Sequence, residues 1–443
     1  MIQLILFLSF FSFSANAAII SFEQDSSLPV VYLNVVFKTG AIHDPKGLEG
    51  LSQLTTEMLL RGTLQQSKES MDTALDFMGA DLSVETRSEA AILRGVFLSA
   101  QLDSFLKLFQ EILIQPAFKD AELTKLKSEL SSKILEEQSH DSILAGKFFN
   151  SFLFEGHPYG NPPHGTLKSI SKITIQDIKN HYKKYFRAQR MLILGAGDAT
   201  EAKLSTWLKS FEGNLSGGEP VSSLSSPPLP QKNRLLFVDK PDRTQTQVFL
   251  GQVGVRMDDP SFFPLHLGNF SFGGGNFSAR MMHEIRVKRG WSYGANSIFR
   301  FGTRPRSWHM YYFPASKDTV AALALGLEML SELRGKGITS DEFEFSKKSI
   351  INSAAFMYDT PQKRVENLIL EKILNLPDGY MKSYAKHLEL VTLEQVNAAL
   401  RSFLAPDKVS ILVLGTAKDL KEQVVQASGV LPADVQVKSF SEE

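Results

Sequence analysis

Three polar residues of this chain have the spacing of a metal site on one face of a helix. Gln53 and Glu57 are four residues apart, so a helix over this segment would place both side chains on the same face. A hydrolytic zinc site needs three protein ligands and an open position for water. An amide oxygen is a poor zinc ligand, and the hydroxyl of Thr56 cannot take a proton from bound water at useful pH. The spacing of a metal site is therefore present without its chemistry.

The sequence around these positions, residues 44–63, resembles the zinc helix of the pitrilysin/insulinase family of metallopeptidases. The resemblance is to the branch that includes the mitochondrial processing peptidases. That family carries the inverted motif H-x-x-E-H. Aligned on the flanking residues, the first His of the motif falls on Gln53, the catalytic Glu on Thr56 and the second His on Glu57. The resemblance thus implies a peptidase frame whose metal-binding residues have been replaced.

The family's third zinc ligand is a Glu in an E-x6-E pattern on a later helix. Glu129 and Glu136 have this spacing, which places Glu136 at the ligand position, although a solvated helix face is the preferred interpretation of Glu129, Glu136 and Glu137. The chain has no Cys, which excludes thiolate zinc sites and Cys nucleophiles. We therefore expect this chain to bind no metal ion. An atypical metal site formed by Gln53, Glu57 and Glu136 is the alternative, and it would lack a base.

A second segment, residues 273–293, is similar to the family's G-G-G…S-R-L…E-I-R-E-K-R-G-L-A-Y signature. The family has an Arg/Tyr pair with the spacing R-x6-Y, which Arg286 and Tyr293 match. The resemblance implies that this pair contacts peptide carbonyl groups and stabilises the oxyanion at a zinc site that faces it. Guanidinium and phenol groups are strong donors and suit that task. An ion pair of Arg286 with Glu284 or Asp341, and a core-edge position for Tyr293, are the structural alternatives.

The three consecutive glycines at the start of this segment predict a tight loop that enters a helix. It is not a phosphate loop, because no G-K-[ST] follows Gly273, Gly274 and Gly275. In the processing peptidases, the corresponding loop of the non-catalytic subunit handles substrate. The loop here lacks their longer glycine insertion, but the resemblance still makes these three residues candidate substrate contacts.

Residues 79–86 resemble the family's G-G-x-x-N-A-x-T strand, which binds extended peptides by edge addition. Such binding uses main-chain hydrogen bonds and leaves little preference for peptide sequence. An ordinary sheet strand is the alternative interpretation. The candidate substrate-binding residues of this strand are Leu82, Ser83, Val84 and Glu85.

The chain repeats one unit at a period near 220 residues. Each half ends with a Thr-initiated amphipathic helix followed by a short aliphatic strand, at residues 173–198 and 391–416. A segment rich in Gly, Ser and Pro, residues 213–233, predicts an exposed linker. We predict an α+β fold with two homologous metallohydrolase-like domains, residues 18–212 and 234–443. Each domain would be a mostly antiparallel sheet covered by helices on one face, and the family implies a clamshell arrangement.

Composition and the N-terminus restrict the setting of the protein. Lys plus Arg and Asp plus Glu number 48 each, so the chain has no charge bias toward nucleic acid or anionic membranes. Residues 1–17 predict a secretory signal, with an apolar run too short to span a bilayer and Ala15-Asn16-Ala17 before the cleavage site. A buried first strand is the alternative, because no Lys or Arg precedes Lys38. We expect an exported protein, periplasmic in a Gram-negative source, without stable membrane insertion.

The retained Arg/Tyr pair and the missing zinc ligands together predict a non-catalytic, substrate-binding subunit of a heterodimeric zinc metallopeptidase. Arg286 and Tyr293 would complete the active site of a zinc-bearing homologous partner. The zinc ion would belong to that partner, and the substrates would be short unfolded peptides. A zinc-free peptide-binding or scaffold protein is the second hypothesis, and a peptidase with an atypical metal site is the third.

Overall fold

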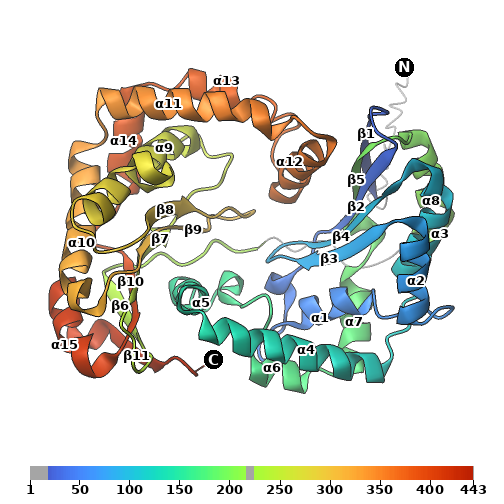
Figure 1. The fold of residues 1–443 in the computed structure, drawn as a ribbon, viewed down its shortest axis with the longest axis horizontal. Coiled ribbons are helices and arrows are strands. Elements are labelled where there is room, and N and C mark those ends of the chain that lie inside the picture. Colours follow the sequence, from blue (N-terminus) through green and yellow to red (C-terminus); the bar gives the residue numbers. More distant parts are fainter. Residues whose placement is uncertain (1–17, 216–223, 443) are drawn as a thin grey trace, which may run out of the picture.

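The computed structural model describes residues 18–215 and 224–442, and these form two similar halves (Figure 1). We call residues 18–215 the N-terminal half and residues 224–442 the C-terminal half. The predicted signal segment, residues 1–17, lies outside the described residues, as does part of the predicted linker. Each half contains one sheet and its own layer of helices.

The N-terminal half contains a five-stranded sheet in which only the β1–β5 pair is parallel. Its order across the sheet is β1 (Ile19–Gln24), β5 (Met191–Gly197), β2 (Val30–Phe37), β4 (Ala91–Leu98) and β3 (Asp81–Thr86). Alternate residues of β2 lie on the same face of the sheet. The side chains of Val31, Leu33 and Val35 are buried on the face that the helices cover. Strand β3 therefore lies at one edge of the sheet.

The helices of the N-terminal half cover one face of this sheet and share a single apolar core with it. They are α1 (Leu51–Met58), α2 (Lys68–Met78), α3 (Leu102–Ile114), α4 (Asp120–Ser139), α6 (Leu167–Lys172), α7 (Ile175–Tyr185) and α8 (Glu201–Phe211). The predicted start of α7 is present: the hydroxyl of Thr174 accepts from the backbone N–H of Asp177, and the carboxylate of Asp177 accepts in return from Thr174.

The C-terminal half repeats this strand order and adds one strand. Its sheet runs β11 (Val435–Ser439), β6 (Arg234–Asp239), β10 (Ser410–Gly415), β7 (Gln247–Val253), β9 (Ser307–Tyr312) and β8 (Ala295–Phe299). Its helices include α9 (Phe262–Asn269), α10 (Thr319–Lys336), α11 (Ser340–Ala354), α13 (Tyr384–Glu389), α14 (Leu393–Phe403) and α15 (Ala417–Ser428). The predicted α+β fold with two homologous, mostly antiparallel sheets is confirmed.

The halves exchange one helix each, which the sequence did not predict. Helix α5 (Asp141–Leu153) belongs to the N-terminal half but packs on β7 and β10 of the other sheet. Helix α12 (Pro361–Leu374) belongs to the C-terminal half and packs on β5 and β2 (Figure 1). Each sheet is thus covered on one face by its own helices and on part of the other face by a borrowed helix.

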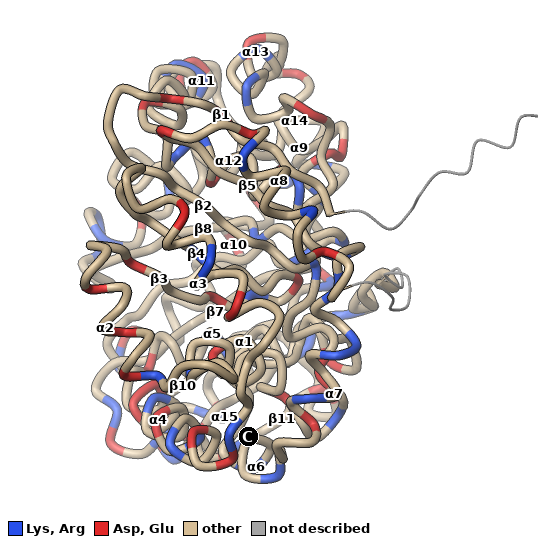
Figure 2. The backbone as a smooth tube through the Cα atoms, turned by 90° about the vertical axis from the view of Figure 1, so that its right-hand side faces the viewer, with Lys and Arg blue, Asp and Glu red and all other residues tan. Residues whose placement is uncertain are grey.

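Ion pairs between the halves accompany this exchange. The guanidinium of Arg364 on α12 lies 2.8 Å from the Glu23 carboxylate and donates a hydrogen bond to Asp25 at 2.6 Å. Lys240 of the C-terminal half bonds to Asp141 of α5 at 2.6 Å. Acidic and basic residues are otherwise interspersed along most elements (Figure 2). Among the described helices, none is long and apolar enough to cross a bilayer.

Buried His309 makes the contact between α5 and the C-terminal sheet sensitive to acid. Its ring lies 5.1 Å from the ring of Phe149 on α5, and burial lowers the pKa of His309 to about 3. The unfolded chain, with an ordinary His pKa, therefore binds more protons between about pH 3 and 6.5, so this residue makes stability rise with pH across that window. We expect His309→Gln to reduce the loss of unfolding free energy between pH 7.5 and 5 by about 2 kcal/mol.

Urea unfolding of both proteins at the two pH values measures this difference. The matched control is His140→Gln, because His140 is exposed. The same pH dependence in wild type and His309→Gln would mean that His309 is not buried in its neutral form.

Candidate functional site

The start of α1 is fixed by a buried carboxylate. Asp44 accepts from the backbone N–H groups of Gly50 and Ser52, both at 2.8 Å, and from the Ser52 hydroxyl at 2.6 Å. Gly50 has φ 94°, a left-handed conformation that favours glycine. Burial raises the pKa of Asp44 to about 7, although these hydrogen bonds act against it. The carboxylate satisfies N–H groups that the first turn of a helix leaves free, and thereby holds α1 in place.

The side chains at the degenerate motif positions form hydrogen bonds within α1, although the buried Oε1 of Gln53 has no partner among the described residues. Gln53 is buried, and its Nε2 donates to Oε1 of Glu57 at 2.6 Å. Thr56 is fully buried, and its hydroxyl donates to the Ser52 carbonyl at 2.8 Å. The i, i+4 spacing predicted from the sequence therefore supports an amide–carboxylate hydrogen bond on α1.

The two carboxylates predicted from the E-x6-E pattern lie on α4, which packs beside α1. Glu129 accepts two hydrogen bonds from the guanidinium of Arg61. Glu136 is exposed, whereas its neighbour Glu137 bonds to His164 at 2.7 Å. Among the described residues, no group of three or more His, Asp or Glu side chains is arranged to hold a metal ion. The residues present therefore do not fit zinc.

The position that would hold a catalytic Glu is buried. Thr56 is 0% exposed, so Thr56→Glu would bury a carboxylate. We expect this change to lower the free energy of unfolding by about 3 kcal/mol or more. Urea unfolding measures the loss, with Thr56→Val as the control, which should cost about 1 kcal/mol. If Thr56→Glu costs less than the control, the site still accommodates a base.

Arg286 and Tyr293 lie together on the surface of the C-terminal half. The guanidinium carbon of Arg286 is 4.2 Å from the ring centre of Tyr293 and 4.8 Å from that of Phe277. Both rings face solvent, since Tyr293 is 75% and Phe277 is 71% exposed. A cation between two aromatic faces is attracted by both rings. The sequence identified the Arg/Tyr pair by its spacing but did not identify Phe277 as the second ring.

Arg286 does not form the alternative ion pair with Glu284 or Asp341, and Tyr293 does not lie at the edge of the core. Glu284 bonds to Lys288 at 2.6 Å and to Arg289 at 2.8 Å. Within residues 18–215 and 224–442, Arg286 forms no ion pair with any carboxylate, and the high exposure of Tyr293 excludes a core position. The Arg286 charge is therefore held in place by rings and is not neutralised by an acid.

The triple-glycine loop closes the outer edge of β8. A Cβ at Gly273 would lie 2.5 Å from the backbone nitrogen of Ser297, and one at Gly274 would lie 2.8 Å from Nδ2 of Asn269. Asn269 itself donates to the Ser297 carbonyl at 3.3 Å. The glycines are needed for this close approach. Gly273 and Gly274 also line a cavity of about 290 Å³. The substrate contact proposed for the three glycines stays a prediction.

The corresponding edge strand of the N-terminal sheet is β3. No described strand pairs with the outer side of β3, and α1 lies beside this strand. Leu82 and Val84 pack into the helical core, and the Glu85 carboxylate is held by Arg87 at 2.6 Å and Arg94 at 2.8 Å. Ser83 is exposed. The side chains of β3 are thus largely occupied, and its main chain is what this edge can offer to a ligand.

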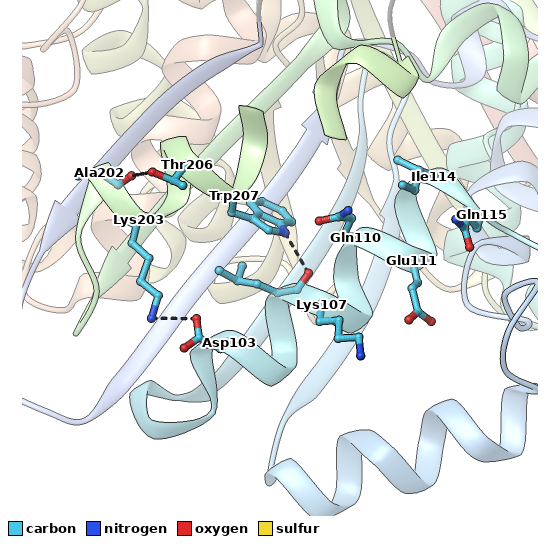
Figure 3. Close-up of a pocket in the computed structure, with 11 residues that line it drawn as sticks. Asp103, Lys107, Gln110, Glu111, Ile114, Gln115, Ala202, Lys203, Thr206 and Trp207 are labelled. Atoms are coloured by element: carbon cyan, nitrogen blue, oxygen red, sulfur yellow. Dashed lines mark hydrogen bonds and ion pairs between the residues drawn. The ribbon is translucent and has the colours of Figure 1, made fainter. Parts of the chain in front are cut away.

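A separate hollow of about 650 Å³ lies between α3 and α8 on the outer helical layer (Figure 3). Asp103 and Lys203 form an ion pair of 2.9 Å across it, and the Trp207 indole donates to the Leu106 carbonyl at 2.9 Å. Its ionisable groups are therefore engaged at least in part by the protein itself. None of the residues predicted for function from the sequence lines this hollow.

The fold and site together define a two-domain protein with the frame of a zinc metallopeptidase and without its metal ligands. Residues 19–166 match the family described as "Insulinase (Peptidase family M16)", and residues 172–350 match "Peptidase M16 inactive domain". The chain belongs to peptidase family M16.

Relatives of known sequence or structure include proteins described as inactive. A Helicobacter pylori protein named "Non-peptidase homolog YmxG" is 23% identical and covers 90% of this chain and 91% of its own length. A Bacillus subtilis protein named "Uncharacterized zinc protease YmxG" is 21% identical, with 90% and 96% covered. A structure from Pseudomonas fluorescens, described as a peptidase M16 inactive domain, is 26% identical with a TM-score of 0.84, covering 91% of this chain and 96% of that chain.

Proposed function

We propose that this chain is the non-catalytic, substrate-binding subunit of a heterodimeric zinc metallopeptidase. It supplies Arg286 and Tyr293 to the active site of a zinc-bearing homologous partner. The observation that carries this proposal is the half-buried Arg286 guanidinium, which lies over the exposed rings of Tyr293 and Phe277 at 4.2 and 4.8 Å. Its own chain gives this charge no carboxylate among the described residues, and α1 of the same chain has no zinc ligands for it to assist.

The stacked geometry supports a role in stabilising an oxyanion. Donors assist such a reaction when they are fixed in advance where negative charge develops. Two rings restrict the orientation of Arg286, while its planar group keeps N–H donors at its rim. The Tyr293 hydroxyl adds a neutral donor beside it. The partner's zinc site would supply the nucleophile and the charge.

The unpaired outer side of β3 supports binding of extended peptides. Within the described chain no strand pairs there, and α1 lies beside β3, whereas Gly273 closely approaches the equivalent edge strand, β8. An added strand would gain main-chain hydrogen bonds with little dependence on its side chains. Short unfolded peptides are therefore the proposed substrates, and the proposed setting is the periplasm or another exported space.

Association with a zinc-bearing M16 homologue tests the proposal. Size-exclusion chromatography with light scattering should give a 1:1 complex. The zinc content of that complex, measured separately, should be one ion per heterodimer. A stable zinc-free homodimer that does not associate with the homologue would instead favour the scaffold hypothesis. Stoichiometric zinc in the isolated chain, together with peptide cleavage that chelators abolish, would contradict both.

A further inference from the structure

A cavity of about 440 Å³ lies at the junction of the two halves. Small-molecule sites in proteins have volumes of about 300–1,000 Å³. Residues of both halves line this cavity, among them Lys38, His43, Glu89, Arg256, Arg304 and Asn375. It is distinct from the Arg286 surface and from the β3 edge, because none of their residues lines it.

The cavity has an excess of positive charge. Lys38, Arg256 and Arg304 line it, whereas Glu89 is its one lining carboxylate among the described residues. Glu89 accepts from the Tyr159 hydroxyl at 2.6 Å and from the backbone N–H of Thr303 at 3.0 Å. This carboxylate is thus committed to holding the halves together.

Two of the three cations have no acidic partner among the described residues. The Lys38 ammonium donates to Oδ1 of Asn375 at 2.8 Å, and burial, followed by the nearby Lys372, lowers its pKa. Nε of Arg304 donates to the Leu224 carbonyl at 2.6 Å. Both Nη groups of Arg304 remain without a partner in the described chain. These donors come from opposite halves and face the same space.

Arg256 and His43 add little net charge to the cavity. Arg256 is paired with Asp258, with Nε to Oδ1 at 2.8 Å, and it contributes less net charge than the other two. Burial, followed by the nearby Arg190 and Lys184, lowers the pKa of His43 to about 4, so its ring is neutral near pH 7. A neutral imidazole can donate one hydrogen bond without adding charge.

We propose that this cavity binds a small oxyanion, a carboxylate or phosphate group, between Lys38 of the N-terminal half and Arg304 of the C-terminal half. A guanidinium fork matches the paired oxygens of either group, and an ammonium adds a point charge. Such a ligand would neutralise the excess charge and link the two halves. The inference is independent of the proposed function, because it requires neither a partner subunit nor the β3 edge.

Isothermal titration calorimetry on the whole purified chain tests this site. The probes are succinate, inorganic phosphate, and one pentapeptide made with a free and with an amidated C-terminus. We expect at least one anionic probe to bind, and the double variant Lys38→Met/Arg304→Met to weaken that binding at least ten-fold. The charge-retaining variant Lys38→Arg should bind within about three-fold of wild type. Added salt should weaken binding in wild type.

Controls separate this inference from general charge effects and from the proposed function. Lys382→Met/Arg401→Met removes two exposed cations elsewhere and should leave binding unchanged. No binding of any probe at millimolar concentration, or equal binding by the double variant, would overturn the inference. If the double variant does not fold, the single variant Arg304→Met replaces it. Weaker binding by this variant would support the inference, and unchanged binding would overturn it. Every variant should still associate with the zinc-bearing homologue. If association does not occur, that result would count against the proposed function and not against the anion site.

Discussion

Replacing Arg286 with Ala should lower peptide turnover by the complex with a zinc-bearing homologue about 100- to 1,000-fold. The guanidinium of Arg286 is a charged donor held between two rings, and its contribution would be made mainly in the transition state. The loss should therefore appear in kcat, with KM nearly unchanged. Steady-state kinetics of the purified complex measures both constants. Association of the two subunits should be unaffected, because the change removes a side chain and leaves both rings.

Two further variants of the same segment make this result specific. Tyr293→Phe keeps the ring that stacks on Arg286 and removes only the hydroxyl, so it should cost less than Arg286→Ala. Arg289→Ala is the matched control, since Arg289 is bonded to Glu284 and does not join the stack. If Arg286→Ala and Arg289→Ala give the same turnover as wild type, Arg286 has only a structural role.

A peptide whose backbone nitrogens are methylated at alternate residues should bind this chain at least ten-fold more weakly than the unmodified peptide. Each main-chain hydrogen bond contributes about 0.5–1.5 kcal/mol net, and methylation removes donors along one edge of the peptide. Both phases of methylation are needed, because alternate residues of a strand face opposite sides. Fluorescence anisotropy with labelled peptides measures the affinities.

The matching control keeps the peptide backbone and changes its side chains. A scrambled peptide of the same composition should bind with nearly the same affinity, because the side chains of β3 are mostly occupied within the protein. Equal binding of both methylated peptides and the unmodified one would show that the β3 edge is not the binding site. Strong dependence on the scrambled order would point to side-chain recognition instead.

Local interactions explain what could be predicted from the sequence. A Thr followed three residues later by a polar side chain forms a capping box within one turn, which is why the helix starts after Thr174 and Thr392 were predictable. The i, i+4 contact of Gln53 with Glu57 is equally local. The spacing of Arg286 and Tyr293 placed them in one segment, and their stacking follows from that proximity.

Contacts between distant segments explain what could not be predicted. The apolar faces of α5 and α12 look like those of ordinary sheet-packed helices, and nothing in their periodicity shows that each packs on the sheet of the other half. Strand β11 is short and half polar, so it lacks the pattern of a buried strand. The burial of Thr56, which closes the former base position, depends on the packing of α1 against α4 and α7.

Turnover by a zinc-bearing M16 homologue, titrated with this chain, tests the central claim most directly. We predict that the chain alone cleaves no peptide, and that added chain raises the homologue's turnover until the ratio reaches one to one. Wild-type chain should saturate this effect, whereas the Arg286→Ala chain should occupy the homologue without raising its turnover. An unchanged rate at every ratio, with the complex formed, would contradict the account.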